Sequence, residues 1–122
     1  MFDKELVLSI LKQIDEALEQ IKTRTKDVKT VSFFTDSPNG KEKLDSVCML
    51  LIAIGESLKN IDKITSGVLF PRYPEIDWTG AKKLRDIIAH HYFDVDAEQI
   101  YWIIEHELTP LSATIKKMIS EI

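Results

Sequence analysis

The chain has 122 residues, of which 44% are hydrophobic and 30% are charged, and its formal net charge at pH 7 is −4. This composition is typical of a folded globular protein and excludes a disordered chain. An acidic chain with a pI near 5.4 also lacks the strongly basic footprint of general nucleic-acid-binding proteins, although a locally basic cleft remains compatible with RNA as a substrate.

Neither a membrane span nor a secretion signal is predicted. The longest apolar run, residues 47–54, is far too short to cross a bilayer, and the first five residues carry acid early without an apolar segment behind them. We therefore expect one domain, residues 1–122, that is cytoplasmic and has no membrane partner. The single cysteine, Cys48, excludes an intrachain disulfide, and its apolar neighbours favour a buried side chain over a catalytic thiol.

The first half of the chain predicts two long helices. Residues 3–24 carry apolar side chains spaced by three and four, which indicates an amphipathic helix, and residues 31–34 predict a short apolar plug after it. Asp36 or Ser37, followed by a proline, indicates the start of the longest helix, which runs from residue 41 to about residue 64. The middle of this helix is apolar nearly all round, which predicts burial in the bundle centre, at a subunit interface, or at both.

The second half predicts a loop and shorter helices. Residues 67–78 contain two prolines and predict the loop, and Asp77 is placed to cap a helix that runs to about His91. Asp94 or Asp96 then caps another helix, and a threonine–proline pair starts a last helix or kinks the one before it. Because no strand pattern of useful length occurs, we expect an all-α bundle of four or five helices.

The candidate site lies in residues 85–96, which hold two of the three histidines. Arg85 and His90 are five residues apart, about 140° around an ideal helix, whereas Asp86 and His90 share a face, so Asp86 could orient the imidazole. Imidazole transfers protons near neutral pH, and guanidinium binds phosphate bidentately. On spacing alone, a structural alternative is favoured, in which Arg85 and His91 cap the helix end and His90 packs with one hydrogen bond.

No glycine-rich phosphate loop, zinc-ligand spacing or serine–histidine–aspartate order occurs, so no metal or cofactor is expected. Instead, the sequence resembles the signature of the HEPN superfamily, an arginine followed after four residues by a histidine and after one more by a tyrosine. In this chain these residues are Arg85, His90 and Tyr92. More narrowly, they resemble the HepT-type toxins, which are encoded beside MntA-type minimal nucleotidyltransferase antitoxins. The flanking segments that agree with this family cover essentially the whole chain: Tyr73-Pro74-Glu75-Ile76-Asp77-Trp78, Gly55-Glu56, Val95-Asp96, Tyr101-Trp102-Ile103 and Leu108-Thr109-Pro110-Leu111.

The resemblance implies a helical bundle that dimerises and brings two Arg–His motifs into one cleft. It implies RNA cleavage without a metal, with the 2′-hydroxyl as nucleophile and a cyclic phosphate as product. Mapped onto this chain, His90 is the acid/base, Arg85 the phosphate and transition-state ligand, and Asp86 a supporting residue. Tyr92 matches the tyrosine that the partner nucleotidyltransferase modifies with AMP, which silences the ribonuclease; the alternative is an aromatic side chain that packs on Trp102 or a neighbouring phenylalanine, Phe93.

The acidic balance leaves open how RNA is held, and Arg72, Lys82 and Lys83 are the candidate contacts beside the motif. Two other functions stay open as well. One is a non-catalytic helical subunit that positions a nucleotide or substrate for a nucleotidyltransferase, which the acidic pI favours. The other is a helical dimer in which the motif has decayed.

Overall fold

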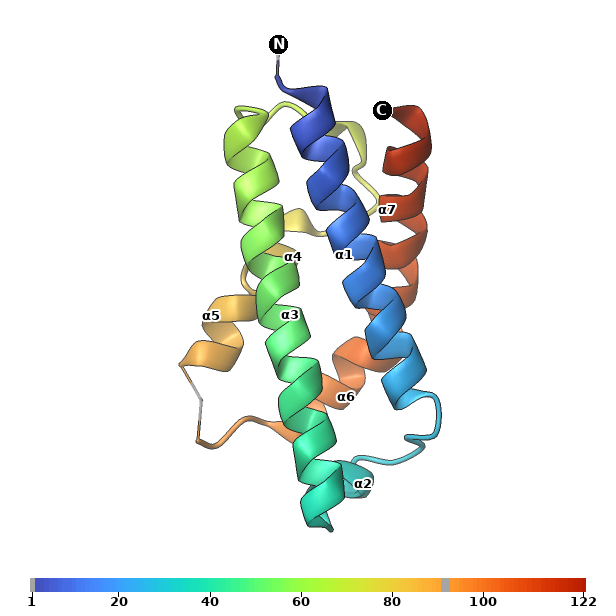
Figure 1. Cartoon of the computed structure of the whole chain (residues 1–122). Helices are drawn as coiled ribbons and strands as arrows, with labels where there is room; N and C mark the ends of the chain where they lie inside the picture. The colour runs from blue at the N-terminus through green and yellow to red at the C-terminus, as the bar shows by residue number, and fades with distance from the viewer. Residues whose placement is uncertain (1, 91–92) are drawn as a thin grey trace.

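The structure is a computed structural model that describes residues 2–90 and 93–122. Within these ranges it contains helices and no strand, which confirms the expected all-α bundle (Figure 1). The four longest helices are α1 (Lys4–Thr25), α3 (Pro38–Ile64), α6 (Ala97–His106) and α7 (Leu108–Glu121). The short elements are α2 (Ser32–Thr35), the 3-10 turn η1 (Phe70–Arg72), α4 (Trp78–Lys82) and α5 (Leu84–Ala89). No described helix is both long and apolar enough to cross a bilayer.

Polar caps set the starts of several helices, as the sequence predicts. The Ser37 hydroxyl accepts a hydrogen bond from the Gly40 amide at 3.0 Å, and α3 therefore begins three residues before the expected position. Asp77 accepts from an amide of α4 at 3.1 Å, and Asp96 accepts from two amides of α6 at 3.0 and 3.3 Å. Each cap satisfies amides that have no partner within the helix.

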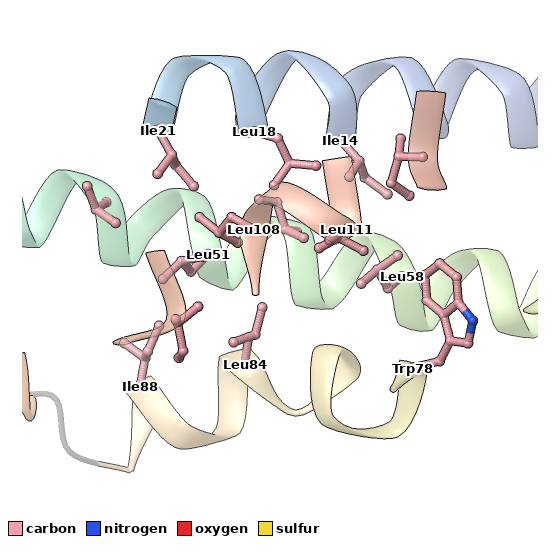
Figure 2. Packing of buried hydrophobic residues seen from close by; sticks show 14 of the residues in the cluster. Ile14, Leu18, Ile21, Leu51, Leu58, Trp78, Leu84, Ile88, Leu108 and Leu111 are labelled. Carbon is pink, nitrogen blue, oxygen red and sulfur yellow. The ribbon is translucent and has the colours of Figure 1, made fainter. Parts of the chain in front are cut away.

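The core lies where α1, α3 and α7 pack together and where α5 covers α3. Figure 2 shows side chains from these helices, and Trp78 from α4, pointing into one shared interior. Burying each such side chain stabilises the fold by about 1.5–3 kcal/mol. The labelled members are Ile14, Leu18, Ile21, Leu51, Leu58, Trp78, Leu84, Ile88, Leu108 and Leu111.

The helix expected over residues 78–91 is divided at Lys83, so the prediction of one continuous helix is wrong. The Lys83 amide donates to the Gly80 carbonyl at 3.1 Å, three residues back, and this tight turn separates α4 from α5. Gly80 is a poor helix former, which makes a break here inexpensive. The segment α5 ends at Ala89 with His90 as its cap, and His91, the expected end, lies outside the described residues.

The loop before α4 is held by aromatic and polar contacts. The Trp78 ring stacks on Phe70 with centroids 4.1 Å apart, and its indole N–H donates to the Tyr73 carbonyl at 2.8 Å. The Tyr73 hydroxyl donates in turn to the Glu121 carboxylate at 2.6 Å, near the end of α7. These contacts fix the direction in which α4 and α5 leave the loop.

Helix α3 lies at the centre of the bundle and packs against α1, α2, α4 and α5, as its apolar middle predicts. It also keeps one stripe in solvent. Met49 is 68% exposed, and Ala53 and Glu56 are exposed on the same side of the helix. We call Met49 and Ala53 the α3 stripe. Glu56, which lies one turn further along the same side of the helix, belongs to the charged cluster described next.

Candidate active site

The helix that carries Arg85 approaches α3 closely because Gly55 has no side chain. A Cβ atom built on Gly55 would lie 3.1 Å from the Arg85 backbone nitrogen and 3.4 Å from the Leu84 Cβ. Leu84 and Ile88, both buried, anchor α5 from the same side. The close approach places the start of α5 beside the residue that follows Gly55, which is Glu56.

Four charged residues form a cluster between α3 and α5. The Arg85 Nε lies 3.2 Å from a Glu56 oxygen, and its Nη1 lies 3.5 Å from an Asp86 oxygen. The Lys59 Nζ lies 3.5 Å from the other Asp86 oxygen and 3.9 Å from Glu56. These side chains are about half exposed, so each pair stabilises the fold by only about 0–1 kcal/mol. The main effect of the cluster is to hold the guanidinium through Nε and Nη1, so that among the described contacts Nη2 is the guanidinium nitrogen left for a further anion.

His90 is oriented through the backbone of Asp86. Its Nδ1 lies 2.6 Å from the Asp86 carbonyl oxygen, one helical turn back. A carbonyl oxygen only accepts, so Nδ1 carries the proton in this hydrogen bond, and the lone pair of the neutral ring is on Nε2. The imidazole is exposed and can meet a substrate through Nε2. The four-residue spacing does bring Asp86 to the imidazole of His90, but the contact is made by the backbone carbonyl of Asp86 and not by its carboxylate.

Asp86 connects the two motif residues, because its carboxylate contacts Arg85 and its carbonyl contacts His90. Tyr92, the expected modification site, lies outside the described residues, as does His91. Trp102, the alternative packing partner considered for Tyr92, stacks on His106 with ring centroids 4.9 Å apart.

The expected RNA contacts differ in their surroundings. Lys82 is held by Asp62, with the two charged atoms 2.9 Å apart, so its charge is already compensated. Lys83 and Arg72 are exposed, and within the described ranges neither has an ion pair. Sequence reasoning missed Lys59 as a cation of the site and Glu56 as the anchor of Arg85. The only available signal for either was the Gly55-Glu56 pair, which lies about thirty residues before the motif.

The buried cysteine is unsuited to catalysis. Cys48 is 7% exposed, and its burial, with a smaller contribution from Asp45, raises the pKa of the thiol to about 11. The thiol therefore stays protonated at neutral pH, whereas a catalytic nucleophile would have to be a thiolate. Among the residues that the structure describes, no group of three or more His, Cys, Asp or Glu side chains could hold a metal ion.

The family model and the relatives that match this chain all carry the names of ribonucleases. The family model "HepT-like: Ribonuclease HepT-like" matches residues 14–118. The chain is 29% identical to "Putative RNase MJ0127" of Methanocaldococcus jannaschii, an alignment that covers 98% of this chain and 92% of that protein. It is also 29% identical to "Probable ribonuclease HepT" of Thermococcus cleftensis, over 88% of this chain and 91% of that protein. The search of solved structures found no match.

Proposed function

The chain belongs to the HepT-like ribonuclease family, and on that basis we propose that it is a metal-independent endoribonuclease with Arg85 and His90 as its catalytic residues. One observation carries the proposal: Asp86 contacts both residues, so that the imidazole of His90 and the guanidinium of Arg85 are held together at one short helix. Neither group needs a metal to act on a phosphodiester.

In the proposed reaction, Nε2 of His90 takes the proton of the ribose 2′-hydroxyl. The 2′-oxygen then attacks phosphorus, and the bond from phosphorus to the 5′-oxygen breaks. A protonated imidazole gives its proton to that leaving oxygen, and the products are a 2′,3′-cyclic phosphate and a 5′-hydroxyl. The Arg85 guanidinium offsets the charge that develops on the phosphoryl oxygens.

The two imidazole roles fit a homodimer in which two copies share one cleft. One imidazole then acts as base while that of the second copy acts as acid. The α3 stripe supports this arrangement, because Met49 and Ala53 give an exposed apolar surface on the same side of the helix as Glu56. Such an interface would bring the two Arg85 side chains near each other.

The cleavage assay compares wild type with His90→Ala and with a matched control, His106→Ala. His106 also lies at the end of a helix, and its Nδ1 lies 3.2 Å from the carbonyl oxygen four residues back, but no Arg–Asp pair adjoins it. We expect His90→Ala to lose cleavage by about 100-fold or more. His106→Ala should cut RNA as wild type does, and EDTA should have no effect. Equal rates for wild type and His90→Ala would remove the catalytic assignment.

We further propose that the chain is the toxin of a toxin–antitoxin pair, and that a minimal nucleotidyltransferase of the MntA type silences it by adding AMP to Tyr92. The resemblance of the motif supports this, since Tyr92 stands two residues after His90. Co-expression with such a partner should add AMP mass increments to wild type and none to Tyr92→Phe. RNA cleavage should fall in step with the modification.

A non-catalytic nucleotide- or substrate-binding subunit is the second candidate, and the net charge of −4 favours it. Contact with Glu56 also compensates part of the positive charge that RNA would meet at Arg85. A tight stoichiometric complex with the nucleotidyltransferase, with Tyr92 unmodified and no RNA cleavage by the free chain, would support this candidate over the toxin.

A further inference from the structure

A cavity lies away from the Arg85 site and has no part in the proposed reaction. It has a volume of about 750 Å³ and lies between the end of α1, the segment that follows it, α6 and α7. None of its lining residues belongs to α3, α4 or α5. Figure 1 shows α7 and α5 on opposite sides of the bundle. Its size is that of a small-molecule site, for which 300–1,000 Å³ is usual.

The floor of this cavity is aliphatic. Leu18 and Ile21 come from α1, Val28 from the segment after it, and Leu108 from α7; all four are buried. Ile104 of α6 completes the surface and is partly buried. Such a floor accepts an alkyl or aryl body, and the one aromatic ring among the described lining residues, Tyr101, is partly buried in the wall.

Four lysines and two glutamates, Glu105 among them, line the cavity, so its rim carries a net positive charge in a chain that is acidic overall. Lys22, Lys26 and Lys29 line one wall and, within the described ranges, take part in no ion pair. Lys116, on the other side, differs because Asp15 and Glu19 hold its ammonium at 2.6 and 3.1 Å. Three uncompensated lysines along one wall attract an acid group on whatever enters the cavity.

The walls are tied together without a ligand. The Tyr101 hydroxyl of α6 donates to the Lys29 carbonyl at 2.9 Å, which holds the segment after α1 against α6. Within α1, the buried Thr25 hydroxyl donates to the Ile21 carbonyl one turn back at 2.7 Å, which fixes the side chain of this lining residue. Because these bonds order the walls in advance, binding costs less conformational entropy.

We propose that this cavity is a binding site for a small amphipathic anion, a free molecule with an alkyl or aryl body and one acid group. The body occupies the aliphatic floor, and the acid group meets Lys22, Lys26 and Lys29. This inference is independent of the ribonuclease assignment, since it uses neither the residues nor the helices of that site.

The test uses the full chain and the fluorescent anion 1-anilinonaphthalene-8-sulfonate as probe, with decanoate as competitor. We expect saturable binding of one probe per chain, displaced by decanoate. Reversal of the three rim lysines should weaken probe binding at least tenfold. The matched control reverses three other exposed lysines and should bind as wild type does. The two triple variants are K22E/K26E/K29E and K4E/K12E/K41E.

A third variant separates shape from charge. Ala113 is an exposed lining residue, and Ala113→Trp fills the cavity without changing the charge. It should lose probe binding while circular dichroism and RNA cleavage stay as in wild type. Undiminished binding by the rim variant or by Ala113→Trp would overturn the proposal. Displacement of the probe by a short RNA but not by decanoate would also overturn it, since the rim would then serve RNA.

Discussion

Adding one methyl group at Gly55 should impair the proposed ribonuclease more than it impairs folding. A Cβ atom there would lie 3.1 Å from the Arg85 nitrogen and 3.5 Å from the Ala81 carbonyl oxygen. Both are backbone atoms, which cannot rotate away as a side chain would. The variant Gly55→Ala therefore requires α5 to move outward by a few tenths of an ångström.

Two opposing terms set the effect on stability. Alanine is favoured over glycine inside a helix by about 1 kcal/mol, whereas overpacking a well-filled contact costs about 1–3 kcal/mol. The free energy of unfolding should therefore fall by about 0–2 kcal/mol. Activity depends on the position of Arg85 relative to the reacting phosphate, and a misplacement of about 1 Å can cost on the order of 100-fold. For the smaller shift expected in Gly55→Ala we predict a loss of about tenfold, and a larger loss for Gly55→Val.

The assay measures initial rates of cleavage of a short RNA at a temperature where wild type and variant are both folded, with urea unfolding followed by circular dichroism. Glu42→Ala, on the exposed side of the same helix, controls for helix propensity. A Gly55→Ala protein that gained about 1 kcal/mol of stability and kept full activity would show that α5 does not rest tightly on α3.

Three further predictions concern the scaffold around the site. Cys48 should react with iodoacetamide at pH 8 at least tenfold more slowly in the folded protein than in urea, because burial raises the pKa of its thiol to about 11. Tyr73 has a pKa raised to about 12, first by burial and then by its hydrogen bond to Glu121. Since the unfolded chain releases this proton near its ordinary pKa of about 10, stability should be lost between pH 10 and pH 12, and less steeply in Tyr73→Phe, as urea titrations at each pH would show. Trp78→Phe keeps an aromatic ring against Phe70 but leaves the Tyr73 carbonyl without its indole donor, so the free energy of unfolding should fall by about 1–3 kcal/mol in the same urea assay.

Local sequence signals predicted most of the fold. The caps Ser37, Asp77 and Asp96 were predictable because a short polar side chain in front of an apolar repeat can accept hydrogen bonds from the free amides of the first turn. The division between α4 and α5 was not predictable in this way. The apolar repeat continues through Lys83, and Gly80 weakens a helix here without showing that it ends. The contact that holds α5, its close approach to Gly55, joins distant parts of the chain.

Only the part of the site that lies in residues 85–96 could be predicted from the sequence. The spacing of Asp86 and His90 indicated that they would meet, but it could not show that the carbonyl, and not the carboxylate, holds the imidazole. Glu56 and Lys59 belong to another helix, and pairing between helices has no signature in sequence spacing. The Gly55-Glu56 pair was recognised as a family feature without being connected to Arg85.

The exposed side of α3 has a mechanical consequence for the proposed dimer. Met49, Ala53 and Glu56 lie on one uninterrupted helix, and Glu56 is the residue that anchors Arg85. The position of the second copy on the α3 stripe therefore fixes its position relative to Arg85. If two copies slid along each other by a single turn, about 5.4 Å, the separation between their guanidinium groups would change by a similar distance. A shift of that size exceeds the reach of any hydrogen bond to a common phosphate. Substitutions at Met49 that alter the register of the two copies should therefore stop RNA cleavage even where the copies remain associated.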